Sequence, residues 1–297
     1  FFITMITGAL VYDGEMINRL LGLMHEGWSI APQLAIRLPV VLTLITACIA
    51  LFTVLGMTDY EPSRVTESST TTTTPNLRQQ LSAPFRQIIA AGRWTLGHQF
   101  ILLVILAALV LDSTARQFVI LAGEYYRLID IPPAWFGLIG AGMSLLGAAS
   151  ARLSRYLVTM HTPQTNFFLL AGLLLLGLAG LNLMLPVYGV LFAIPVFSMM
   201  SIVSFQSSYY INREVDSAHR ATVLSFRGLA LNLGLGTASL FYTGLIATLK
   251  TGYTEIDDPV LLRETVFVDA LLAFPIYFIA LAALLLLFGL RFRKRLR

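Results

Sequence analysis

Two charged residues, Asp112 and Arg116, lie inside the apolar run LVLDSTARQFVI of residues 109–120. Their spacing of four places them on one face of a helix, where an acid and a base can pair. A charged side chain at mid-membrane costs at least about 2.5–3.5 kcal/mol, and such residues usually mark functional sites. The pair therefore predicts either a site that binds a solute or a proton, with Asp112 as the protonatable group, or a structural ion pair between helices.

Other polar residues in apolar surroundings extend the candidate site. Gln117 follows the pair directly, Gln206 lies in a later apolar run beside several serines, and Asn232 lies in the next one. Each is predicted either to contact a solute or to form a hydrogen bond between helices. Arg227 is expected to extend along its helix toward the inner membrane surface, as long basic side chains do, in preference to the alternative that it contacts a substrate.

The elements that position these residues are predicted to be membrane-spanning helices. Of the 297 residues, 57% are hydrophobic and only 12% are charged, against about 25% charged in soluble domains. Apolar runs of about 20 residues fit helices that cross a bilayer. We predict an all-α polytopic membrane protein with an early span at 38–57 and the end of another at 1–12. Six later spans are predicted at 100–121, 134–151, 167–185, 187–210, 222–248 and 266–290.

A polar segment divides the chain into an early and a later part. ESSTTTTTPNLRQQ, at 67–80, is typical of a flexible linker. We therefore predict four regions: an early transmembrane region at 1–57, a cytoplasmic linker at 58–98 with a short interfacial helix near 84–93, a six-helix transmembrane region at 99–290, and a basic cytoplasmic tail at 291–297.

The positions of Lys and Arg predict the orientation. With the linker inside, thirteen of these residues fall in inside regions, whereas Arg127, Lys250 and Arg263 are the three in outside loops. Short loops rich in Lys and Arg stay in the cytoplasm, so the C-terminus is predicted to be cytoplasmic. The tail RFRKRLR is then interpreted as an anchor that contacts anionic membrane lipid and not nucleic acid, despite a pI of about 9.3.

Glycines and aromatic residues give two further expectations. Gly137, Gly140, Gly228, Gly234 and Gly236 recur along two spans, which predicts either close helix packing or surfaces that slide as a gate. Near the outer end of the first later span, Glu124 is expected to be solvated or to line a cavity mouth. Its neighbours Tyr125 and Tyr126, together with Trp135, are expected to form an interfacial aromatic belt.

Two segments resemble the major facilitator superfamily (MFS) of transporters. RATVLSFRGLALNLGLG, at 220–236, resembles the entry into helix eleven, and GALVYDGEMINRLLG, at 8–22, is similar to the end of helix four in a bacterial branch of uncharacterised and drug-efflux-like members. The resemblance implies an MFS-type bundle with a complete C-terminal six-helix half and a partial N-terminal half. On this resemblance, the sequence has no counterpart of helices one to three or of the signature loop between helices two and three, and helix five is absent or badly degraded.

The resemblance implies a secondary active transporter in a bacterial inner membrane that moves a small-molecule substrate by alternating access. Coupling to protons is a hypothesis suggested by Asp112. The alternative is a non-transporting membrane protein, either a truncated remnant or an assembly partner. We expect no enzymatic activity, no cofactor and no metal site, because the sequence carries no phosphate-binding loop, and His98, His161 and His219 are not spaced as metal ligands.

Overall fold

The computed structural model describes residues 37–57, 86, 89–90 and 92–293, and the regular structure in this part of the chain is helical, without strands. The expected span end at 1–12, most of the Thr-rich linker and the last four residues of the basic tail lie outside the described residues. The helices are α4 (Leu38–Leu55), α6 (Gln99–Leu128), the 3-10 turn η1 (Pro133–Trp135), α7 (Phe136–Met160), α8 (Pro163–Leu181), α9 (Val190–Glu214), α10 (Ser217–Gly252) and α11 (Pro259–Arg293).

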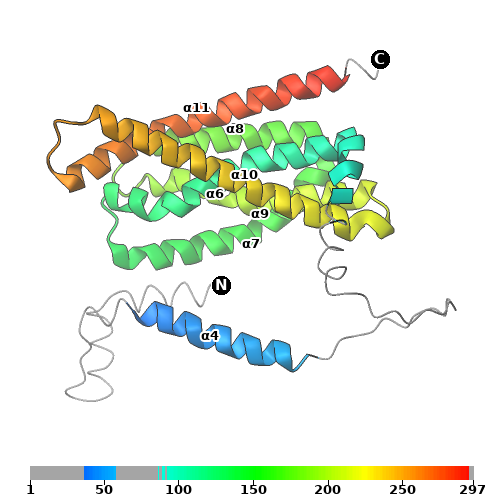
Figure 1. Ribbon diagram of the computed structural model, residues 1–297, viewed down its shortest axis with the longest axis horizontal. Coiled ribbons are helices and arrows are strands. Elements are labelled where there is room, and N and C mark those ends of the chain that lie inside the picture. The colour runs from blue at the N-terminus through cyan, green and yellow to red at the C-terminus, as the bar shows by residue number, and fades with distance from the viewer. Residues whose placement is uncertain (1–36, 58–85, 87–88, 91, 294–297) are drawn as a thin grey trace.

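The six helices from α6 to α11 are each long and apolar enough to cross a membrane, which confirms the six later spans in number and type. These helices lie alongside one another in alternating directions, while α4 stands apart from them (Figure 1). In α4 the described apolar stretch is shorter, Thr43–Leu55, and large side chains such as Phe52 are exposed. The six-helix bundle is therefore the part of the chain that positions the candidate site.

Several helices begin earlier than the apolar runs predict, because polar residues cap them. The Thr162 hydroxyl accepts a hydrogen bond from the Thr165 amide, and Pro163 follows at the first helical position of α8. The Asp216 carboxylate accepts one from the His219 amide at the start of α10. Such caps satisfy backbone groups that the helix leaves unpaired. These helices therefore extend beyond the apolar length that sequence patterns detect.

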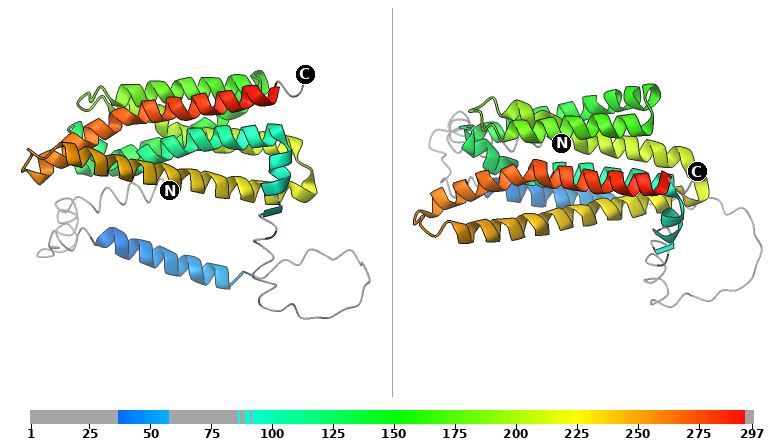
Figure 2. Two further views of the ribbon diagram at one scale, coloured as in Figure 1. Left: turned by 45° about the horizontal axis from the view of Figure 1, so that its top comes forward. Right: turned by 90° about the horizontal axis from the view of Figure 1, so that it is seen from above.

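The most buried helix of the bundle is α6, and Figure 2 shows it running among its neighbours. We call the end of the bundle where α6 begins the linker end and the other the distal end. At the distal end the structure corrects one expectation. Tyr125 and Tyr126 are 0% and 5% exposed and belong to the core, whereas Trp135 is 58% exposed as expected. The two tyrosines pack edge-on against each other, and Tyr125 also packs against Phe118 and Tyr126 against Phe136. They are buried because neighbouring parts of the bundle cover this end of α6.

A short helical segment precedes α6 at the linker end. Residues 92–97 are helical. They overlap the end of the helix expected near 84–93 and continue four residues beyond it. The ring of Trp94 stacks on His98, with centroids 3.6 Å apart, and on His219 of α10, with centroids 5.8 Å apart. The segment is therefore packed against α10 as well as against α6.

Two contacts join α8 to α9, one at each end of the helices. At the linker end, the buried Asn166 amide donates to the Tyr210 hydroxyl of α9 at 2.7 Å and to the Leu157 carbonyl of α7 at 3.0 Å. Toward the distal end, Gly177 and Gly180 of α8 face Phe192 of α9, with no room for a side chain between the helices. Small residues permit this close approach.

Candidate functional site

The acid and base predicted on one helix face form an ion pair near the middle of α6. The Arg116 Nη2 donates to the Asp112 Oδ2, and the carboxylate residue is 2% exposed. Asp112 lies about 20 Å along the helix from Gln99, since each residue adds about 1.5 Å. The Arg116 side chain keeps 24% of its surface exposed. A charged pair thus lies deep in the bundle, with the acid enclosed and the base reaching outward.

Asn232 of α10 connects this pair to a second helix. The Arg116 Nη1 donates to the Asn232 Oδ1 at 3.0 Å. Because a guanidinium is only a donor, the Asn232 side chain must present its oxygen to it. The structure therefore brings together three of the predicted site residues, Asp112, Arg116 and Asn232.

Arg227 also belongs to this network, contrary to the expectation that it extends to the membrane surface. Its Nη1 donates to the Ser204 carbonyl at 3.0 Å, the Ser207 hydroxyl at 2.8 Å and the Ser208 hydroxyl at 2.6 Å, all on α9. It also interacts electrostatically with Asp112. The serines are visible in the sequence, but which helix they face depends on how α9 and α10 pack. We call Asp112, Arg116, Asn232 and Arg227 the charge network.

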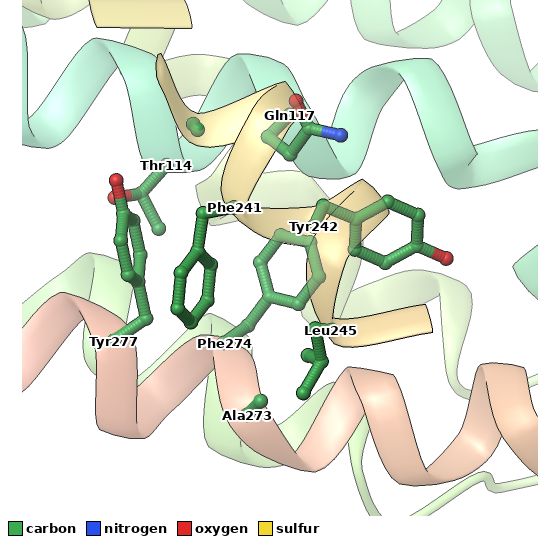
Figure 3. A pocket seen from close by; sticks show the side chains of 9 residues that line it. Thr114, Gln117, Phe241, Tyr242, Leu245, Ala273, Phe274 and Tyr277 are labelled. Atoms are coloured by element: carbon green, nitrogen blue, oxygen red, sulfur yellow. The ribbon is translucent and has the colours of Figure 1, made fainter. Parts of the chain in front are cut away.

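Gln117 lies next to the charge network in sequence but makes a different contact. Its Oε1 accepts a hydrogen bond from the Ser239 hydroxyl of α10 at 2.6 Å. With Thr114 it borders a cavity whose other wall consists of aromatic rings from α10 and α11 (Figure 3). Phe241 and Tyr277 stack there with centroids 4.7 Å apart. The free volume is about 10 Å³, which holds about one water molecule and no solute.

Gln206 is fully buried in α9, and neither its amide nitrogen nor its carbonyl oxygen has a hydrogen-bond partner among the described residues. Among the predicted polar site residues that the structure describes, Gln206 is therefore the one whose side-chain amide makes no hydrogen bond. A buried amide without partners is unfavourable by about 1–3 kcal/mol.

At the distal end, Glu124 joins α6 to α11 by ion pairs. Its Oε1 lies 2.7 Å from the Arg263 Nη2, and its Oε2 lies 3.6 Å from the Arg127 Nη1. The carboxylate is partly enclosed rather than fully solvated. Within the described residues, no group of three or more His, Cys, Asp or Glu side chains is placed to hold a metal ion.

The glycines predicted to pack or to slide have different surroundings. A Cβ added to Gly234 would lie 2.7 Å from Leu109 of α6, whereas the described residues leave open space around Gly228 and Gly236. Gly137 and Gly140 of α7 are partly exposed. Gly177 and Gly180 of α8 were not singled out by sequence reasoning. An added Cβ at Gly180 would lie 2.0 Å from Phe192 of α9, the shortest such distance among the described glycines, and one at Gly177 would lie 2.9 Å from Val196. Their signal was present as small residues three positions apart.

We expect Gly234→Ala to lower stability by about 1–3 kcal/mol, because the added methyl overpacks against Leu109. Gly236→Ala is the matched control on the same helix, and we expect it to be neutral or stabilising by up to about 1 kcal/mol through helix propensity. Thermal unfolding of the purified variants in detergent measures both. Equal melting temperatures would contradict the close approach of α10 to α6.

No protein-family model, curated protein or solved structure matches this chain.

Proposed function

We propose that the chain is a secondary active transporter of the major facilitator type, which moves a small solute across a bacterial inner membrane by alternating access. The six helices would form the C-terminal half-bundle of that architecture, with their C-terminus in the cytoplasm. The charge network would form part of the solute or proton path.

The observation that carries the proposal is an ion pair buried near the middle of an apolar, membrane-length helix. Asp112 is 2% exposed, and it is held by Arg116 of its own helix and lies within electrostatic range of Arg227. Charges at this depth are unfavourable in lipid, and they occur mainly in pathways for solutes, ions or protons. The exposed part of Arg116 supports the same interpretation, because it leaves the guanidinium accessible to a ligand.

The geometry suggests how the network would respond during transport. Asp112 and Asn232 both accept hydrogen bonds from Arg116, so they compete with any anionic or polar group that approaches this guanidinium. A proton placed on Asp112 would weaken its bond to Arg116 and free the guanidinium. Protonation of the acid and binding of a solute to the base would then be coupled, as a proton-driven transporter requires.

A second candidate is a non-transporting membrane protein in which the network only joins helices. The observation that favours it is that Arg227 Nη1 is shared among three oxygens of α9, which ties α10 to α9 without any ligand. In that case neutralising Asp112 should change stability alone.

Transport in proteoliposomes tests the proposal, with benzoate, phosphate, methyl glucoside and tetraphenylphosphonium as labelled probes and a pH gradient imposed in either direction. We expect at least one probe to cross faster than in protein-free liposomes. Asp112→Asn should reduce that gradient-driven flux by about tenfold or more, the loss of one charge-assisted contact.

The melting temperature of Asp112→Asn controls for misfolding. A folded Asp112→Asn protein with wild-type flux would rule out Asp112 as the proton site. Flux equal to that of protein-free liposomes for every probe would argue for the non-transporting alternative.

A further inference from the structure

The charge network carries more positive than negative charge. Arg116 and Arg227 bring two guanidinium groups, which stay protonated in proteins, whereas Asp112 brings one carboxylate. Asp112 is also the carboxylate that acts electrostatically on Arg227. The network as described therefore has one positive charge in excess when Asp112 is ionised, and two when it is protonated.

The other acids that pair with described side chains lie too far along the bundle to balance this charge. Glu124 is paired with Arg127 and Arg263 at the distal end. Asp269 accepts a hydrogen bond from the Tyr253 hydroxyl, and Tyr253, at the end of α10, lies about 39 Å along that helix from Arg227. Glu214 and Asp216 lie at the turn between α9 and α10, where they contact Arg213 and His219. Arg227 lies about 15 Å along α10 from Ser217, well inside the span.

The two guanidinium groups also have donors left over. The buried Nε atoms of Arg116 and Arg227 have no hydrogen-bond partner among the described residues. The three hydrogen bonds of Arg227 to described residues all come from its Nη1, and none comes from its Nη2. Buried donors without partners are unfavourable, and each can be satisfied by an oxygen that a ligand brings.

We infer that the charge network binds an oxyanion, so that the solute of the proposed transporter is a small molecule with a carboxylate or phosphate group. That the oxyanion is transported rests on the proposed function, whereas its binding rests on the charge network alone. The planar guanidinium fork matches the paired oxygens of carboxylates and phosphates. A cationic solute would instead meet an excess of like charge in a medium that screens it poorly.

Ligand-dependent thermal stability tests the inference without requiring transport. The purified chain is melted in detergent with sodium benzoate or sodium phosphate, and with tetraphenylphosphonium chloride or methyl glucoside at matched ionic strength. A ligand that binds only the folded state raises the melting temperature. We expect benzoate or phosphate to do so, and Arg227→Gln to weaken that binding by about tenfold or more, the value of one charge-assisted contact.

Two further variants make the outcome decisive. Arg220→Gln removes an exposed charge from the linker end of the same helix, and it should leave the anion effect unchanged. Arg227→Lys keeps the charge and loses the fork, so its anion affinity should also fall, which carries the test if Arg227→Gln does not fold. Stabilisation by tetraphenylphosphonium or methyl glucoside alone, or by no probe, would overturn the inference. Wild-type anion affinity in the Arg227 variants would overturn it as well.

The two proposals fail in different ways. Suppose that tetraphenylphosphonium crosses proteoliposome membranes faster than protein-free ones, while benzoate and phosphate neither bind nor cross faster. The transport proposal then stands and the oxyanion inference fails. If an anion stabilises the protein through Arg227 but no probe crosses the membrane, the anion site stands and the transport proposal fails.

Discussion

Arg116→Gln alone should lower the stability of the protein by about 3–5 kcal/mol, because it leaves the enclosed Asp112 carboxylate without its partner. Asp112 is 2% exposed, so water cannot replace the guanidinium. Arg227 attracts Asp112 but is held by α9 oxygens and makes no hydrogen bond to it. We expect little folded protein on size-exclusion chromatography and a much lower melting temperature for what remains.

The double variant Asp112→Asn/Arg116→Gln separates an unpaired charge from a lost contact. It removes both charges, so we expect most of the stability to return. Asp112→Asn alone should be milder than Arg116→Gln, because Arg116 keeps Asn232 and partial exposure. The four melting temperatures form a double-mutant cycle. Additive effects, or an Arg116→Gln protein as stable as the wild type, would show that the two side chains are not coupled.

Gly180→Ala should destabilise the contact between α8 and α9, with a loss at or above the upper end of the roughly 1–3 kcal/mol typical of overpacking. An added Cβ would lie 2.0 Å from Cδ1 and 2.3 Å from Cγ of Phe192. Because Cγ lies one bond beyond Cβ, rotation of the ring about χ2 does not remove the clash. The helices must separate or Phe192 must leave its position. Thermal unfolding in detergent measures the loss.

Gly172→Ala is the control for Gly180→Ala, since it lies on the same helix with open space around it. We expect it to be neutral or slightly stabilising. Gly180→Ala should cost less stability in a Phe192→Ala background than in the wild type, because alanine lacks the Cγ and Cδ1 atoms that the added methyl meets. If Gly180→Ala and Gly172→Ala melt at the same temperature, the helices do not approach as closely as described.

The number and type of the membrane-length helices could be predicted because the signal is local. A span of about 20 apolar residues identifies itself without knowledge of its neighbours. The ends were less accurate, because α8, α10 and α11 begin in polar or Pro-containing sequence that hydropathy does not count. Asp216 and Thr162 are cap signals in the sequence, and reading them would have moved two of these boundaries.

The candidate site was predictable only as far as one helix determines it. The pairing of Asp112 with Arg116 follows from their spacing on α6. The contact of Arg116 with Asn232, and that of Arg227 with the α9 serines, depend on how three helices rotate against one another, which spacing along one helix does not encode. The same limit explains Tyr125 and Tyr126. Aromatic residues near a helix end fit both a membrane-interface belt and a core, and the packing around α6 decides between them.

The joining of α8 and α9 at both ends has a mechanical consequence. One contact is the hydrogen bond from the Asn166 amide to the Tyr210 hydroxyl, and the other is the close approach of Gly177 and Gly180 to Phe192. Two helices that are held together at two separated points resist both sliding and separation. We therefore expect α8 and α9 to move as one rigid unit. Any large displacement within the bundle should then occur between this rigid unit and the other helices, and not between α8 and α9.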